Sequence, residues 1–207
     1  MSKMLNIEDV IPNNQADIEK IIKEHKSRFN IPLYKRITKD MSTKDTSIID
    51  DIYFQTAFST FYGINRFKSL EWQCEYYNVF KKMKSADERG EEVTIEKILK
   101  SLYKIKTDGK QMVELSFASK MLAAIDENKP IYDTNVANTL VIKKSSKHKD
   151  VFRNAKDIYD TLEAKYKNYK RHTGYNKAIA AFDKECSEGT TISPVKKIDF
   201  ILWSLGK

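Results

Sequence analysis

The 207-residue chain contains few of the residues that cross-link or interrupt a fold, with two cysteines, four prolines and six glycines. Cys74 and Cys186 lie far apart and form no CxxC motif, so neither a disulfide framework nor a cysteine-based zinc site is expected. An iron–sulfur cluster is excluded because it needs more cysteine ligands than the chain supplies. This cysteine usage is typical of an intracellular protein.

Histidine is also scarce, and His25, His148 and His172 belong to no HxxxH or HExxH pattern. No segment approaches the roughly 20 consecutive apolar residues that a membrane-spanning helix needs. The N-terminal stretch MSKMLNIEDVIPNN lacks the apolar core of a signal peptide. The sequence therefore predicts a cytoplasmic protein with no metal ion, no organic cofactor and no membrane-spanning segment.

Hydrophobic residues make up 41% of the chain and charged residues 32%, a balance that is typical of a folded protein. The length suits one core or two small lobes around a cleft, and we expect a single domain over residues 1–207. Lysine and arginine number 37 against 29 aspartates and glutamates, which gives a net charge of +8. This surplus favours polyanionic partners such as DNA, although it also occurs in proteins that bind no nucleic acid.

Apolar residues recur at helical spacing along almost the whole chain, and no segment shows the alternation of a β-strand. The pattern predicts an all-α fold made of many helices. Pro32 and the polar residues 37–47 are interpreted as a loop. The predicted helices cover residues 14–29, 48–62, 69–83, 94–105, 119–126, 133–142, 151–166, 175–186 and 194–205, and residues typical of helix starts precede several of them, at Asn14, Ser69, Thr94, Asp133 and Ser193.

The stretch SFASKMLAAIDENKPIYD places Lys120 just after a run of small residues and ends on Asp133. A helix over residues 119–126 would be about 12 Å long, and the return segment can extend to about 20 Å. Asp133 can therefore double back beside Lys120, at a position where it would cap the next helix.

These two residue types suit chemistry at a sugar carbon. We expect Lys120 at the N-terminal end of its helix and partly buried, because both effects lower the pKa of an amine and leave a nucleophile near neutral pH. An ionised Asp133 could stabilise the positive charge that develops on a sugar as its glycosidic bond breaks. The simpler interpretation is a solvated lysine and an ordinary helix cap.

Two segments, ELSFASKMLA and PIYDTNVANTL, resemble the core of the helix-hairpin-helix DNA glycosylase superfamily, in particular its 8-oxoguanine glycosylase-like branch. In that superfamily a hairpin of the form LPGVGxK joins two helices, its lysine attacks the sugar carbon, and an aspartate at the start of a following helix completes the site. The resemblance implies a glycosylase-like fold with Lys120 as nucleophile and Asp133 as catalytic carboxylate beside a cleft. It also implies that the hairpin residues Ser116, Ala118 and Ser119 bind DNA, with Ser116 and Ala118 in place of the family's glycines.

Further candidate contacts lie outside this region. Lys143, Lys144 and Lys147 form a basic loop that we predict to contact DNA phosphates, although a solvated loop is an equal alternative. On a helix face, two tyrosines could stack on bases or pack inward, and packing is favoured; this face comprises Lys165, Tyr166, Lys167, Tyr169, Lys170 and Arg171. Four further aromatic residues could line a pocket for an extruded base or pack in the core, and the core is favoured for each: Trp72, Tyr76, Tyr77 and Trp203.

The main hypothesis is a DNA glycosylase with β-lyase activity that excises a damaged purine such as 8-oxoguanine, using Lys120 and Asp133. The alternative is a non-catalytic helical module that keeps this fold and binds DNA or a protein, with the two residues serving packing and capping. A defence protein that acts on modified DNA is a third interpretation. Neither the recognised base nor the oligomeric state is predicted by the sequence.

Overall fold

The computed structural model describes residues 4–107, 109–143 and 147–206 and confirms the all-α prediction. Over these ranges the only strands are β1 (Lys106–Thr107) and β2 (Lys110–Gln111), which pair antiparallel. The α-helices are α1 (Ile7–Val10), α2 (Gln15–His25), α3 (Ile31–Met41), α4 (Ile52–Tyr62), α5 (Leu70–Glu88), α6 (Ile95–Leu102), α7 (Leu115–Ile125), α8 (Thr134–Thr139), α9 (Val151–Tyr169), α10 (Gly174–Glu185) and α11 (Pro194–Leu205). Short 3-10 helices are η1 (Lys26–Arg28), η2 (Thr46–Asp50), η3 (Ile64–Arg66) and η4 (Ser187–Gly189).

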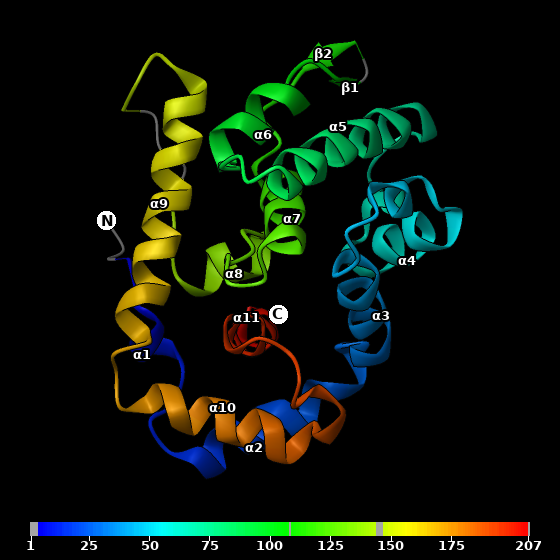
Figure 1. The fold of residues 1–207 in the computed structure, drawn as a ribbon. Helices are drawn as coiled ribbons and strands as arrows, with labels where there is room; N and C mark the ends of the chain where they lie inside the picture. The colour runs from blue at the N-terminus through cyan, green and yellow to red at the C-terminus, as the bar shows by residue number, and fades with distance from the viewer. Residues whose placement is uncertain (1–3, 108, 144–146, 207) are drawn as a thin grey trace.

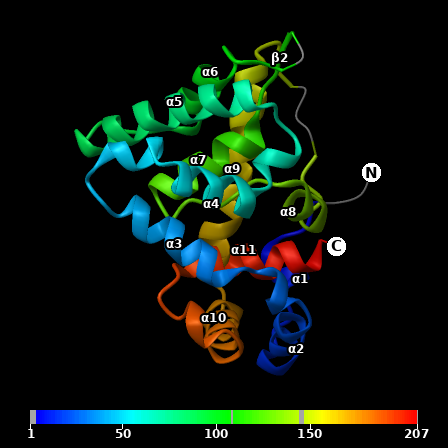
Figure 2. The same ribbon diagram turned by 90° about the vertical axis from the view of Figure 1, so that its right-hand side faces the viewer.

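The helices surround α11, which runs through the middle of the molecule and packs against α8 and α2 (Figures 1 and 2). α2 and α10 lie side by side at one end, although they come from opposite ends of the chain. α5 and α6 lie at the other end, and α9 spans the distance between the two ends (Figure 1). The first and last parts of the sequence therefore share one layer.

Aromatic side chains fill the core between α4 and α5. The ring of Phe58 has its centroid 4.6–6.3 Å from the rings of Phe54, Tyr62, Tyr76, Tyr77 and Phe80. Trp72 stacks on Tyr76, and Trp72, Tyr76 and Tyr77 are all buried, which confirms the core interpretation for these three residues. The rings around Phe58 meet it at tilted and edge-to-face angles. Such ring pairs stabilise the fold beyond the contribution of the apolar area that they bury.

The predicted helix starts are confirmed where a side chain caps the first turn. The side chains of Asn14, Ser69, Thr94, Asp133 and Ser193 each accept a hydrogen bond from a main-chain N–H of the helix that follows. Such caps satisfy N–H groups that have no partner within the helix.

The loop predicted around Pro32 is wrong, because residues 31–41 form helix α3. Pro32 lies in the first turn, where the missing N–H breaks no helical hydrogen bond. Ile31, Tyr34 and Ile37 recur every third residue and are buried, whereas the opposite face is polar. That narrow apolar face was hidden among the charged residues of the segment.

The single helix predicted over residues 48–62 is also wrong. Residues 46–50 form the 3-10 helix η2, and the chain then bends at Asp51, whose carboxylate accepts hydrogen bonds from the N–H groups of Tyr53 and Phe54. This cap starts α4 afresh. As a result Ile52 and Tyr53 point to solvent instead of joining the core.

Candidate active site

Lys120 lies in the middle of α7, which begins at Leu115, so the prediction of a helix start at Ser119 is wrong. The residues expected to form a hairpin turn are helical, because neither Ser116 nor Ala118 is a glycine and the segment has an apolar face to bury. Ala118 and Ser119 are fully buried, so their side chains cannot reach a DNA phosphate here. Of these three residues, Ser116 alone lines the cleft into which Lys120 also points.

Ser119 has a structural role in holding the return segment against α7. Its hydroxyl accepts a hydrogen bond from the N–H of Tyr132 at 3.0 Å, and it is within 3.2 Å of the Tyr132 carbonyl. The carbonyl of Pro130 accepts a hydrogen bond from the hydroxyl of Tyr159 at 3.0 Å. These contacts bring the residue before Asp133 alongside the turn that carries Lys120.

Lys120 and Asp133 both line one cleft with a volume of about 870 Å³. The cleft lies between the start of α3, the end of α4, η3, α7, the start of α8 and α11. Aromatic side chains make up much of its walls, namely Phe29, Phe61, Tyr62, Phe67, Phe117, Phe200 and Trp203. Arg28, Arg66 and Lys68 add positive charge to the lining. A volume of this size is typical of small-molecule sites, which are mostly apolar with a few polar groups.

The amine of Lys120 is held by the main chain and by an aromatic ring. Its Nζ donates a hydrogen bond to the carbonyl of Tyr62 at 3.2 Å and lies 5.1 Å from the ring centroid of Phe117. Burial lowers the pKa of Lys120 to about 8, with Lys196 adding to the decrease and Asp133 opposing it. Of the two causes expected from the sequence, partial burial therefore accounts for the lowered pKa, and the helix start does not.

Asp133 caps α8 as predicted. Its Oδ1 accepts a hydrogen bond from the N–H of Val136 at 2.8 Å, while its carbonyl accepts one from Ala137. The charge of Asp133 acts on the pKa of Lys120, Lys196 and Asp199. The carboxylate is thus part of a group of four charged side chains within the cleft.

The other two members of this group, Lys196 and Asp199 on α11, were missed by the sequence analysis. The helix is apolar on most sides, yet Lys196, Lys197 and Asp199 are all buried in its first half. Asp199 lies on the same face as Val195 and Leu202, one turn away on either side. A charge within an apolar stripe was the available signal, since buried charges need a partner or a function.

Burial raises the pKa of Asp199 to about 7, although Lys196 and a hydrogen bond from Tyr166 both act to lower it. Burial also lowers the pKa of Lys196, against the opposing charges of Asp199 and Asp133. Strongly perturbed groups of opposite charge in one cleft are typical of functional sites.

The basic loop is separate from the cleft. Lys143 and Lys147 are exposed and do not line the cleft, and Lys144 lies outside the described residues. Their contact with DNA stays a prediction. Tyr166 and Tyr169 of α9 are buried, which confirms that they pack inward, and Lys165 is buried with them. Lys167 of α9 and Lys170 and Arg171 just after its end are exposed.

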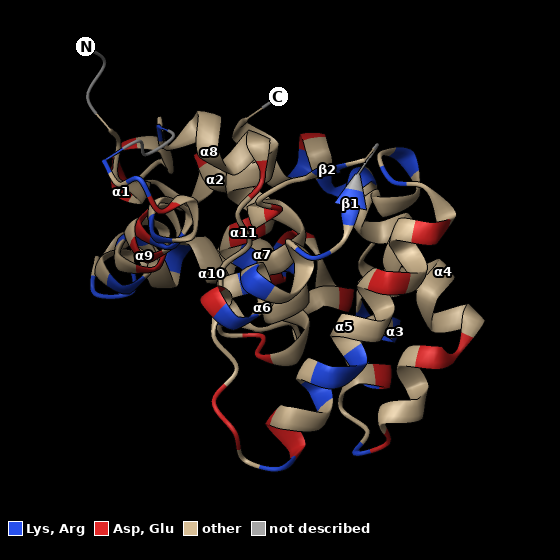
Figure 3. Ribbon diagram, turned by 90° about the horizontal axis from the view of Figure 1, so that it is seen from above, with Lys and Arg blue, Asp and Glu red and all other residues tan. Residues whose placement is uncertain are grey.

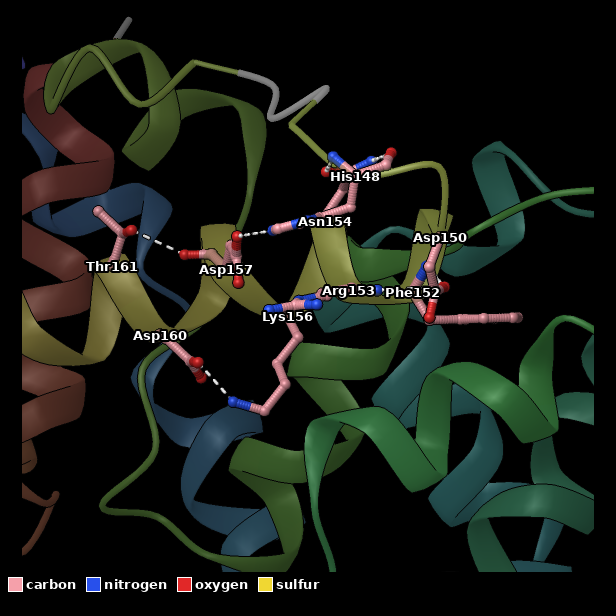
Figure 4. A network of polar contacts seen from close by, with 9 residues as sticks. All are labelled: His148, Asp150, Phe152, Arg153, Asn154, Lys156, Asp157, Asp160 and Thr161. Atoms are coloured by element: carbon pink, nitrogen blue, oxygen red, sulfur yellow. Dashed lines mark hydrogen bonds and ion pairs between the residues drawn. The ribbon is translucent and has the colours of Figure 1, made fainter.

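The end of this loop is fixed to the first turns of α9 (Figure 4). His148 Nε2 lies 3.0 Å from Asp157 Oδ2, and the side chain of Asn154 exchanges two hydrogen bonds with the main chain of His148. Asp150 caps the helix by accepting a hydrogen bond from the N–H of Phe152 at 2.9 Å. These contacts hold the C-terminal end of the loop, at His148, against α9.

Lysine and arginine are distributed with aspartate and glutamate over most of the elements (Figure 3). Over the described residues, no three histidine, cysteine, aspartate or glutamate side chains come together as metal ligands. Nor does any helix within those ranges have the length and apolar character needed to cross a membrane. No protein-family model, curated protein or solved structure matches the chain.

Proposed function

We propose that the protein is a DNA glycosylase with β-lyase activity that excises a damaged purine, such as 8-oxoguanine, extruded from DNA into the cleft. The observation that supports this most is the pairing of a partly buried lysine amine, with its pKa lowered to about 8, and a capping carboxylate in one aromatic-walled cleft. An amine with this pKa is a partly deprotonated nucleophile near neutral pH.

In the proposed reaction the free amine of Lys120 forms a bond to C1′ of the nucleotide as the C1′–N bond breaks. The base leaves with the bonding electrons and takes up a proton. Asp133 stabilises the positive charge that develops on the sugar. Loss of a proton from the lysine nitrogen and opening of the sugar ring then give an imine, and removal of a C2′ proton expels the 3′ phosphate. Water hydrolyses the imine and releases Lys120.

The cleft offers the contacts that an extruded base needs. Enzymes that act on a base take it out of the stack and hold it between aromatic or apolar side chains. Phe61, Phe117 and Trp203 supply such surfaces, and Arg28 and Arg66 supply positive charge for the neighbouring phosphates.

One observation supports the alternative of a non-catalytic binding module. Phe67, which lines the cleft, is 72% exposed, and Leu70 at the start of α5 is 76% exposed. Exposed apolar residues that lie together mark surfaces that contact another macromolecule, and Phe67 and Leu70 are three residues apart in the chain. A binding module would contact its partner through Phe67 and Leu70, without any chemistry at Lys120.

Borohydride trapping tests the proposed function. The protein is mixed with duplex oligonucleotides that contain an abasic site or 8-oxoguanine, and the imine is reduced to a stable adduct that runs more slowly on a denaturing gel. We expect an adduct whose rate of formation rises with pH and levels off above about pH 8, because deprotonation of Lys120 supplies the nucleophile. If neither duplex gives an adduct, the enzymatic proposal is rejected.

A second test concerns the basic loop. The affinity for duplex DNA should fall as salt rises, and replacing Lys143, Lys144 and Lys147 with glutamine should reduce the slope of log Kd against log salt by roughly 0.9 for each phosphate that the loop neutralises in the wild type. A matched variant with three exposed lysines elsewhere replaced by glutamine, at Lys20, Lys23 and Lys35, should keep the original slope. Equal slopes for both variants would contradict a role for the loop.

A further inference from the structure

Among the described residues, none donates a hydrogen bond to one of the two carboxylate oxygens of Asp199. The residue is 4% exposed and lines the cleft. Its Oδ1 accepts a hydrogen bond from the hydroxyl of Tyr166, and the main-chain N–H of Ile131 also stabilises the carboxylate. Oδ2 has no hydrogen-bond partner in the part of the chain that the structure describes. A buried acceptor of this kind is costly unless something donates to it.

Lys196 lies next to this oxygen but does not satisfy it. The distance from Lys196 Nζ to Asp199 Oδ2 is 3.9 Å, whereas a charge-assisted hydrogen bond is typically about 2.7–2.9 Å long. The amine is instead surrounded by aromatic rings, with the centroids of Tyr34, Phe61, Tyr62 and Phe200 at 5.0–5.5 Å. This cage fixes the lysine and leaves N–H groups available beside the acceptor of Asp199.

We infer that Asp199 and Lys196 read the edge of the extruded base, and that the site selects bases with a ring N–H next to a carbonyl. This inference rests on the proposed function. Asp199 accepts the hydrogen bond of the ring N–H, and Lys196 donates to the carbonyl oxygen. Oxo-purines such as 8-oxoguanine and hypoxanthine have this edge, whereas adenine has an amino group beside a bare ring nitrogen.

Charge and chemistry favour the carbonyl-containing edge. Lysine pairs preferentially with the keto oxygen of purines, while the amino edge of adenine is typically read by an amide side chain. The four charged groups also lie close enough to influence one another, since Asp133 acts on Lys196 and on Asp199. One pair, Lys120 and Asp133, thus faces the sugar, and the other faces the base attached to it.

The test compares a reaction that needs the base with one that does not. Single-turnover excision of 8-oxoguanine should fall about tenfold or more in Asp199→Asn and in Lys196→Met, because a buried partner of the base edge is removed. Trapping at an abasic site, where no base is present, should stay within about twofold of wild type for both variants when it is measured on the plateau of each variant's pH profile, because removing the charge of Lys196 also raises the pKa of Lys120. Lys196→Met keeps the length of the side chain and suits the aromatic cage, so it remains informative if Asp199→Asn does not fold.

A competition assay addresses the base class without any substitution. Free hypoxanthine should slow abasic-site trapping by the wild-type protein, and free adenine at the same concentration should not. If both variants excise 8-oxoguanine as wild type does, or if adenine competes as well as hypoxanthine, this inference is overturned while the glycosylase proposal stands. If the wild type forms no adduct at an abasic site, the proposed function itself fails and the inference fails with it.

Discussion

Replacing Lys120 with glutamine should abolish the borohydride-stable adduct and lower base excision by more than about a thousandfold, as expected when a nucleophile is removed. The amide of glutamine cannot form an imine with a sugar. It can still donate to the carbonyl of Tyr62, which accepts from the lysine in the wild type. The melting temperature should therefore stay close to that of the wild type or rise, since a desolvated amine has been replaced by a neutral group. Gel trapping and thermal unfolding measure the two effects separately.

Lys165→Gln is the matched control for this experiment. Lys165 is buried, burial lowers its pKa as it does that of Lys120, and its Nζ donates to the carbonyl of Leu5 at 2.6 Å. It does not line the cleft. The control should trap DNA as the wild type does. An adduct of wild-type yield from Lys120→Gln would show that another amine is the nucleophile and would remove the central support for the proposed chemistry.

Helical periodicity was sufficient to predict the fold class because most helices bury a broad apolar face. α6, for example, buries Ile95, Ile98, Leu99 and Leu102, which recur at helical spacing after the cap at Thr94. The errors arose where tertiary packing overrides the local pattern. Residues 35–40 are mostly polar, yet the buried side chains of Ile31, Tyr34 and Ile37 are enough to hold the segment as a helix.

The candidate site was only partly accessible to sequence reasoning. Lys120 and Asp133 lie thirteen positions apart, so their proximity follows from the length of one helix and one return segment. Lys196 and Asp199 join them only through the packing of α11, and no local spacing predicts that contact. Partial burial of Lys120, which lowers its pKa, was expected from the sequence, whereas the expected contribution of a helix start was wrong because Lys120 lies in the middle of α7.

The position of Asp133 depends on packing between several helices. The return segment before Asp133 is anchored from three directions, by Ser119 of α7, by Tyr159 of α9 and by Asp199 of α11. The helix just before the return segment and two helices later in the chain therefore determine where the carboxylate lies. A site built on such rigid elements is pre-organised, which is what electrostatic stabilisation of a developing charge requires.

Replacing Asp133 with asparagine should lower excision of 8-oxoguanine roughly a hundredfold, because the charge that stabilises the sugar is removed. Asparagine also caps helices well and retains an oxygen for the N–H of Val136, so the free energy of unfolding should change by less than about 1 kcal/mol. The negative charge of Asp133 raises the pKa of Lys120. Without it that pKa falls below about 8, and the pH at which abasic-site trapping levels off should move to lower pH.

The shift of the pH profile distinguishes an electrostatic role from a purely structural one. Asp150→Asn is the matched control, because Asp150 caps α9 with a hydrogen bond to the N–H of Phe152 but does not line the cleft. It should change stability by a similar amount and leave both excision and the pH profile as in the wild type. If Asp133→Asn lowers excision no more than Asp150→Asn does, and its trapping profile is unshifted, Asp133 is a helix cap and the two-residue chemistry proposed for the cleft is wrong.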